Sequence, residues 1–221
     1  MPSKYDYFCL LLIIIMIGIS AYFYSFLPER IASHWNIQGR ADGFSSKAWF
    51  FAPYLGLTVL LYALFFIIPK IDPLKQNVLK FMKYFEWFKV LLILFMLYLL
   101  LAVIAANLGA WPNMSYIVLP AVAILLYYAG VLCQHSERNW FIGIRTPWTL
   151  SSDTVWKKTH KIGAILFKLL ALYTLLAFIV FQFYAIQYFF WAFLIPLLIV
   201  AFYPVVYSYF EWKKEEKARK S

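Results

Sequence analysis

Six long apolar blocks constrain the fold of this 221-residue chain more than any other feature. They cover residues 7–27, 48–68, 88–106, 115–133, 163–182 and 188–210. A helix rises about 1.5 Å per residue, so about 20 apolar residues cross a hydrocarbon layer about 30 Å thick. Because only 14% of the residues are charged, the chain lacks the surface of a soluble domain. We therefore predict an all-α membrane protein, a polytopic bundle of six transmembrane helices.

The last two blocks need a turn between them, although no Gly or Pro separates Gly163 from Pro196. One helix over residues 163–210 would be about 70 Å long, more than twice the bilayer thickness. We expect the turn in the polar stretch Gln182 to Gln187, and the turn between spans three and four in "GAWPNMS". The first block is too long for a signal peptide and lacks a small-x-small cleavage site, so we expect a retained helix.

The distribution of Lys and Arg predicts the orientation. With a cytoplasmic N-terminus, segments 1–6, 69–87, 134–162 and 211–221 face the cytoplasm and hold 15 of these residues, whereas the external loops hold three. Cytoplasmic loops carry the excess of Lys and Arg in membrane proteins. We therefore expect a protein of the cell membrane with N- and C-termini in the cytoplasm. Lys89 and Lys168 lie just inside their spans, where their long stems can snorkel toward the headgroups.

The net charge of +10 follows from these juxtamembrane lysines, which meet anionic lipid, so we expect the bilayer as a partner and no direct contact with nucleic acid. The two cysteines, Cys9 and Cys133, lie in spans without a CxxC pattern, and we expect apolar packing residues rather than a disulfide or zinc site. No cofactor is expected.

Three regions are predicted along the chain. Residues 1–70 form an N-terminal two-span unit with an external loop at 28–47. Residues 71–110 form a cytoplasmic amphipathic helix that leads into span three. Residues 111–221 form a three-span unit with a cytoplasmic loop at 134–162.

The stretch "FIGIRTPWTLSSDTVWKKTHKIG", residues 141–163, is polar and basic in an otherwise apolar half of the chain. Pro147 restricts the residue before it to extended geometry, which predicts a turn at "TPW". Ser151 or Ser152 then caps a helix with Asp153 in its first turn, and Asp153 is spaced to pair with Lys157. Trp156 and His160 are four residues apart and share one face of that helix.

Arg145 stands among hydroxyl side chains, and a guanidinium in such a cluster binds a carboxylate or phosphate or ties the loop to helix carbonyls. Interfacial aromatic residues and topology-setting lysines are the alternative explanation of the segment. We take a cytoplasmic partner site as the hypothesis. Its residues are Arg145, Thr146, Trp148, Thr149, Ser151, Trp156 and His160. A lone interfacial His such as His160 is more often hydrogen-bonded structure than a metal ligand.

The external loop "LPERIASHWNIQGRADGFSSK", residues 27–47, is longer than a connection between two spans requires. It has turn signals at Gly39 and at Asp42-Gly43, and Ser45 or Ser46 can cap span two. It is either a compact cap on the bundle or a recognition surface. The candidate sensing residues are His34, Trp35, Asn36 and Asp42. Glu29, His34 and Asp42 do not have the spacing of a known metal site.

The stretch after span two starts with Asp72 as a predicted N-cap and Pro73 at the first helical position. Its apolar positions form one stripe of an amphipathic helix at the membrane surface. The members of the stripe are Leu74, Val78, Met82 and Phe85.

Both polar segments resemble one family. "IGIRTPWTLSSDTVWKKTHKIG" resembles the signature of the SdpI family, membrane proteins named for immunity to a secreted sporulation-delay toxin. The matching positions are Ile142, Gly143, Arg145, Thr146, Pro147, Trp148, Thr149, Leu150, Val155 and Trp156. The external loop resembles a small N-terminal domain of unassigned function that often precedes it. There the matching positions are Leu27, Pro28, Ile31, His34, Asn36, Gly39 and Asp42, whereas Ala32 replaces a Pro found in many relatives.

The resemblance implies a multi-pass immunity and signalling protein that protects against a membrane-active peptide toxin outside and recruits a repressor protein inside. A transporter or channel for a small solute or ion is the alternative, although the sequence places no ionisable group at mid-membrane. An enzyme is not expected, because no HExxH, GxSxG or buried aspartate pair is found.

Overall fold

The computed structural model of the chain describes residues 2–36, 38–110, 113–184 and 188–220. Within these residues, six helices are long and apolar enough to cross a membrane. They are α1 (Lys4–Tyr24), α2 (Lys47–Ile71), α4 (Met82–Asn107), α5 (Ser115–His135), α7 (Asp153–Tyr184) and α8 (Phe189–Lys220). The short elements are β1 (Arg30–Trp35), β2 (Ala41–Ser46), α3 (Lys75–Lys80) and α6 (Pro147–Ser151). The six-helix, all-α prediction is confirmed.

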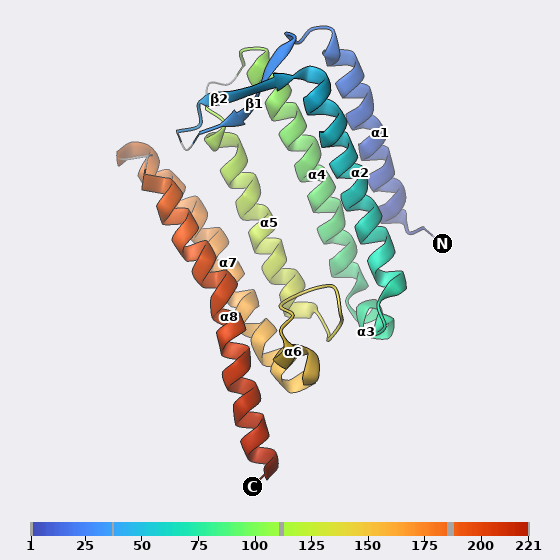
Figure 1. Cartoon of the computed structure of the whole chain (residues 1–221), viewed down its shortest axis with the longest axis vertical. Helices are drawn as coiled ribbons and strands as arrows, with labels where there is room; N and C mark the ends of the chain where they lie inside the picture. Colours follow the sequence, from blue (N-terminus) through green and yellow to red (C-terminus); the bar gives the residue numbers. More distant parts are fainter. Residues whose placement is uncertain (1, 37, 111–112, 185–187, 221) are drawn as a thin grey trace.

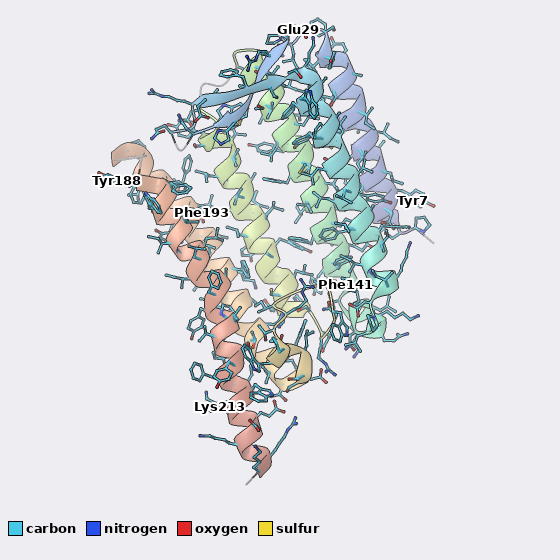
Figure 2. All side chains as sticks on the ribbon, viewed as in Figure 1. Tyr7, Glu29, Phe141, Tyr188, Phe193 and Lys213 are labelled. Atoms are coloured by element: carbon cyan, nitrogen blue, oxygen red, sulfur yellow. The ribbon has the colours of Figure 1, made fainter. Side chains whose placement is uncertain are left out.

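The long helices alternate in direction, so β1 and β2 lie at one end of the bundle and α3, α6 and both chain ends lie toward the other (Figure 1). We name these the hairpin end and the loop end. The long helices project apolar side chains outward along their length; Ile14 is 65% exposed and Phe202 is 63% exposed. Figure 2 shows this outward layer, with Glu29 at the hairpin end and Lys213 toward the loop end. Such an apolar surface needs lipid around it, and the chain is a multi-pass membrane protein.

The turn predicted in "GAWPNMS" lies between α4 and α5, with residues 111–112 outside the described residues. Of the turn predicted at Gln182 to Gln187, the first residues belong to α7, which ends at Tyr184, and residues 185–187 lie outside the described residues. Several helix boundaries differ from the prediction. α7 begins at Asp153 instead of residue 163, because nothing in "DTVWKKTHKIG" interrupts a helix. The helix predicted after Asp72 is divided into α3 and the start of α4. Its apolar stripe packs inward, since Val78 and Phe85 are buried in one cluster with Leu132 of α5.

Asp72 was wrongly predicted as the N-cap of that helix. It follows the last residue of α2, and the residue that precedes α3 is Leu74. The Asp72 carboxylate accepts from the Leu74 amide at 2.7 Å through Oδ1, and from the Trp140 amide at 2.9 Å through Oδ2. Because Asp72 is only 2% exposed, this carboxylate is a buried tie between the end of α2 and a loop 68 residues later.

The segment predicted as an external loop forms an antiparallel hairpin, β1 with β2, which the sequence analysis did not predict. Asn107, in the last turn of α4, fixes it to the bundle. Its Oδ1 accepts from the Ala32 amide at 2.7 Å, and its Nδ2 donates to the Ala32 carbonyl at 3.1 Å. Ser46 caps α2 as predicted, accepting from the Trp49 amide at 3.3 Å.

Lys89 does not snorkel toward the headgroups, contrary to the prediction. It is 1% exposed and forms ion pairs with Asp6 of α1 and, at 2.5 Å, with Glu86 of α4. Asp6 and Glu86 are themselves buried. Low-dielectric surroundings make an unpaired charge costly, and here one ammonium is shared by two carboxylates in a cluster that joins the first and third long helices. We name it the ion cluster.

α5 and α7 approach each other closely at Gly130. A Cβ at Gly130 would lie 2.8 Å from the Ala164 carbonyl oxygen, so only glycine allows this spacing. α7 therefore runs beside α5 from the loop end upward, and it carries α8 on another side (Figure 1). This packing fixes the first turns of α7, which hold the candidate site.

Candidate functional site

Residues 136–152, which we name the polar loop, connect α5 to α7 and fold back against the start of α7. Asn139 organises the first half of the loop. It is fully buried, and its Oδ1 accepts from the amides of Phe141 at 2.9 Å and Ile142 at 2.6 Å. Its Nδ2 donates to the carbonyls of Glu137 and Ile142, both at 2.9 Å. A single side chain thereby replaces the secondary structure that this stretch lacks.

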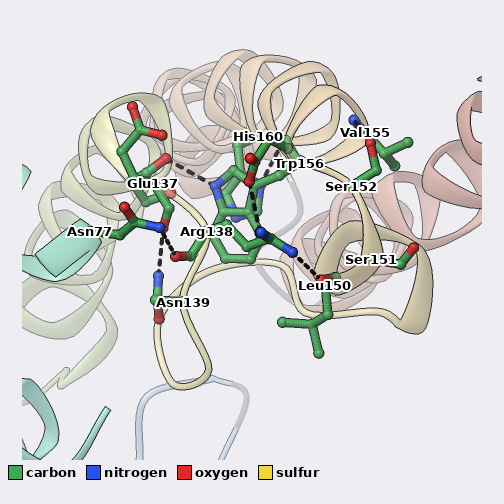
Figure 3. Close-up of polar contacts among 12 residues, drawn as sticks. Asn77, Glu137, Arg138, Asn139, Leu150, Ser151, Ser152, Val155, Trp156 and His160 are labelled. Carbon is green, nitrogen blue, oxygen red and sulfur yellow. Dashed lines mark hydrogen bonds and ion pairs between the residues drawn. The ribbon is translucent and has the colours of Figure 1, made fainter. Parts of the chain in front are cut away.

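Trp156 and His160 form the buried floor of the loop. Their rings stack with centroids 3.9 Å apart, and they are 0% and 2% exposed. The prediction that they share a helix face is confirmed. Trp156 Nε1 donates to the Ser136 carbonyl at 3.0 Å, which ties α7 to the end of α5 (Figure 3). The indole is thus both the largest fully buried side chain and a hydrogen-bond donor.

Both ring nitrogens of His160 are engaged. Nε2 accepts from the Ile144 amide at 2.9 Å, and Nδ1 lies 2.9 Å from the Trp156 carbonyl. This arrangement assigns the proton to Nδ1 and holds the ring as a neutral structural group. Gly143 precedes Ile144 with φ of +106°, and a Cβ there would collide with the imidazole. Within the described residues, no group of three or more His, Cys, Asp or Glu side chains suits a metal.

Thr146 and Thr149 form a capping box at the start of α6. The Thr149 amide donates to Thr146 Oγ1 at 3.1 Å, and the Thr146 amide donates to Thr149 Oγ1 at 2.9 Å. Thr146 Oγ1 also lies 2.9 Å from Ser208 Oγ of α8. The "TPW" segment therefore begins a short helix with Pro147 in its first turn, instead of the predicted turn. Both threonines are buried, so their hydroxyls hold the loop and do not face solvent.

Ionic contacts close the outer side of the loop. Ser152 caps α7 as predicted, accepting from the Val155 amide at 3.3 Å, and donates to Glu215 of α8 at 2.6 Å. Asp153 was predicted to pair with Lys157, but its Oδ1 lies 2.7 Å from Nε of Arg138. Arg138 also donates to the Leu150 carbonyl at 2.9 Å (Figure 3). Asp153 pairs with Arg138 instead of Lys157 because the loop folds back over the start of α7, and sequence spacing alone does not show that fold.

Arg145, Trp148 and Ser151 reach the surface of the loop. Arg145 is exposed, and it donates from Nη1 to the Trp140 carbonyl at 2.8 Å. Trp148 is half-buried, with its ring edge-to-face with Tyr209 of α8 at 5.1 Å. Ser151 is exposed and donates to the Trp148 carbonyl at 3.0 Å. We name these three residues the Arg145 surface.

The candidate sensing residues divide in the same way. His34 and Asp42 form an exposed pair across the hairpin, with Nδ1 and Oδ1 2.6 Å apart. Trp35 packs against the cluster of Ala102, Val103, Met114 and Ile117. Asn36 Oδ1 accepts from the amides of Gln38 and Arg40, which shapes the turn. The hairpin therefore caps the end of the bundle and also presents one polar pair.

Sequence reasoning missed three residues of the site: Asn139, Asp72 as a partner of the loop, and Asn77. Asn77 Nδ2 donates to the Arg138 carbonyl at 2.9 Å (Figure 3). Asn139 could have been identified from its residue type and its position in a polar loop. An Asn side chain there often forms a hydrogen bond with the backbone two residues later. No local sequence pattern predicts the contacts of Asp72 and Asn77 with a loop more than 60 residues later in the chain.

Comparison with known proteins matches two regions of the chain. Residues 136–208, from the start of the polar loop into α8, match the SdpI/YfhL protein family. Over this region the chain is similar to SdpI/YfhL proteins. Residues 11–58, which contain the hairpin, match a domain of unknown function (DUF1648). The resemblance found in the two polar segments is thereby confirmed.

One relative is the "Immunity protein SdpI" of Bacillus subtilis (strain 168). It is 29% identical over 142 residues, which cover 64% of this chain and 65% of the relative. The match thus spans somewhat less than two thirds of either protein. No solved structure matches the chain.

Proposed function

We propose that this chain is an SdpI-type membrane immunity protein that protects against a membrane-active peptide toxin. In this proposal, the hairpin end faces outward and meets the toxin, and the Arg145 surface faces the cytoplasm and receives a repressor protein. The similarity to the SdpI/YfhL family and the role named for the Bacillus subtilis relative support immunity as the role.

The exposure of the Arg145 guanidinium on the polar loop is the observation that supports the cytoplasmic half of the proposal most strongly. The loop beneath it is fixed by buried hydrogen bonds from Asn139, Trp156 and His160. A guanidinium has five N–H donors, and the structure gives one contact of Arg145, to the Trp140 carbonyl. An exposed guanidinium that is anchored at one nitrogen and has further donors free suits a carboxylate on a protein partner. The four buried candidates, Thr146, Thr149, Trp156 and His160, act in this proposal by shaping that surface.

At the other end, His34 and Asp42 are the two candidate sensing residues that are exposed and available to a toxin. Trp35 and Asn36 contribute through the hairpin shape, since they pack or hydrogen-bond inward. A toxin that enters the membrane passes this end first in the predicted orientation.

The test is survival of a toxin-sensitive bacterium that expresses this chain. Wild-type protein should protect, and Arg145→Ala should abolish protection or repressor retention at an unchanged membrane level. Loss of a charge-assisted contact of about 1.5–3 kcal/mol weakens partner binding by roughly 10- to 150-fold. His34→Ala should lower toxin capture. Lys75→Ala is the matched control, because Lys75 is an exposed base at the same end whose side chain has no described hydrogen bond or ion pair.

Full protection by Arg145→Ala at wild-type abundance contradicts a role for the Arg145 surface. Failure of the wild-type chain to protect contradicts the immunity proposal itself. Ion or solute flux through purified protein in liposomes would instead support the transporter alternative.

A further inference from the structure

A polar cavity of about 480 Å³ lies between the end of α5 and one face of α7. It is distinct from the Arg145 surface, none of whose three residues lines it. Its charged lining consists of three lysines of α7 and one carboxylate. These are Lys157, Lys161, Lys168 and Glu137.

The helix geometry brings the three lysines together. At 3.6 residues per turn, Lys157, Lys161 and Lys168 project within about 40° of one another around α7. Lys161 and Lys168 are two turns apart, about 10 Å along the axis, and long lysine side chains can converge over that distance. Ala164 lies between them and lines the cavity with a short side chain, which leaves room for a ligand.

The lysines that face the cavity are not neutralised. Lys157 and Lys161 are exposed and have no hydrogen bond or ion pair to any other described residue. Lys168 donates to the amide oxygen of Gln134, which is uncharged. By contrast, Lys158 projects from another face of α7 and pairs with Glu211 of α8 at 2.7 Å. The one carboxylate in the lining, Glu137, leaves a clear excess of positive charge.

The cavity also lies at a boundary along α7. No charged residue follows Lys168 in this helix, which ends at Tyr184. Ile165, 48% exposed, is part of the lining beside the lysines. A ligand here contacts lysine ammonium groups on one side and the start of the lipid-facing surface on the other, which suits a phospholipid with its phosphate toward the lysines.

We propose that this cavity binds a phosphate group, supplied by the headgroup of an anionic phospholipid or by free phosphate. The ammonium groups of Lys157 and Lys161 contact the phosphate oxygens, and Lys168 holds the inner end of the site. The amphiphilic lining favours the phospholipid as the source. A bound lipid would also seal the α5–α7 boundary next to the polar loop.

The test uses the purified full-length chain and native mass spectrometry after exposure to vesicles of phosphatidylglycerol or of phosphatidylcholine. Wild-type protein should retain phosphatidylglycerol in preference. The double variant Lys157→Gln with Lys161→Gln should bind it roughly 30-fold more weakly, since each lysine near the surface contributes about a fivefold factor. The control, Lys75→Gln with Lys83→Gln, removes two exposed charges outside the cavity and should bind as wild type does.

A calorimetric titration with inorganic phosphate distinguishes the source. Phosphate binding that is lost in the cavity variant, without any preference for phosphatidylglycerol, assigns the site to free phosphate. The proposal is overturned if wild type shows neither preference nor phosphate binding, or if the cavity and control variants lose binding equally. None of these measurements uses the toxin, so they succeed or fail independently of the immunity proposal.

Discussion

Replacing Lys89 by methionine removes the cation from the ion cluster and retains most of its side-chain volume. Lys89 is 1% exposed and is the shared partner of Asp6 and Glu86. The variant leaves two carboxylates facing each other without a counter-ion, at the contact between α1 and α4. Removing one member of a buried ion pair typically costs about 3–5 kcal/mol, and we expect Lys89→Met to fall in this range.

Glu86→Gln is the matched comparison. It leaves Asp6 and Lys89 as a charge-balanced pair and keeps a polar group beside the ammonium. We expect it to cost about 1 kcal/mol, the net value of one hydrogen bond. In the triple variant Asp6→Asn, Glu86→Gln, Lys89→Met no buried charge is left, and the side-chain oxygen of Asn at position 6 can still accept from the Ser3 backbone amide at the N-cap. It should recover most of the stability that Lys89→Met loses.

The measurement is equilibrium unfolding of the detergent-solubilised protein, followed by the fluorescence of its nine tryptophans. The reasoning is refuted if Lys89→Met unfolds at the same denaturant concentration as Glu86→Gln. It is also refuted if the triple variant is no more stable than Lys89→Met, because the cost then reflects lost packing instead of unpaired charge.

Two further substitutions test the loop and the hairpin. Gly143→Ala places a Cβ against His160 at a backbone φ of +106°. It should destabilise the polar loop by about 1–3 kcal/mol and so speed cleavage of the loop by a protease. An unchanged rate of cleavage would contradict the described loop geometry. Asn107→Ala leaves the Ala32 amide and carbonyl without their hydrogen-bond partner, and each unpaired buried group costs about 1–3 kcal/mol of stability. The variant should therefore accelerate amide hydrogen exchange in residues 30–46. Unaltered exchange would show that the hairpin is stable without Asn107.

The six spans could be predicted because lipid imposes a length and a composition that a single sequence displays directly. Their ends could not be placed as well. α7 continues through the polar residues from Asp153 to Gly163, and hydropathy marks where a helix becomes apolar, not where it begins. The Trp156 and His160 face was predictable because it depends on helical spacing alone.

The missed features depend on contacts between distant parts of the chain. The hairpin is held by Asn107, 75 residues after Ala32, and Lys89 finds Asp6 83 residues earlier. The same cause explains the ion pair of Asp153. Helical spacing predicts Lys157 as its partner, whereas in the structure its partner is Arg138. Residue type and spacing select candidates for a site, whereas tertiary packing decides which of them are buried. Thr149 and Arg145 are four residues apart in one motif, yet Thr149 is 0% exposed and Arg145 reaches the surface.

The most direct measurement concerns the side of the membrane that each end faces, since an external toxin and a cytoplasmic repressor require opposite sides. In a Cys9→Ala, Cys133→Ala background, Arg40→Cys and Ser151→Cys each place one exposed thiol, in the hairpin and in the polar loop respectively. A membrane-impermeant maleimide should label Arg40→Cys on intact cells and Ser151→Cys only after the membrane is permeabilised. Labelling of Ser151→Cys on intact cells would contradict the account.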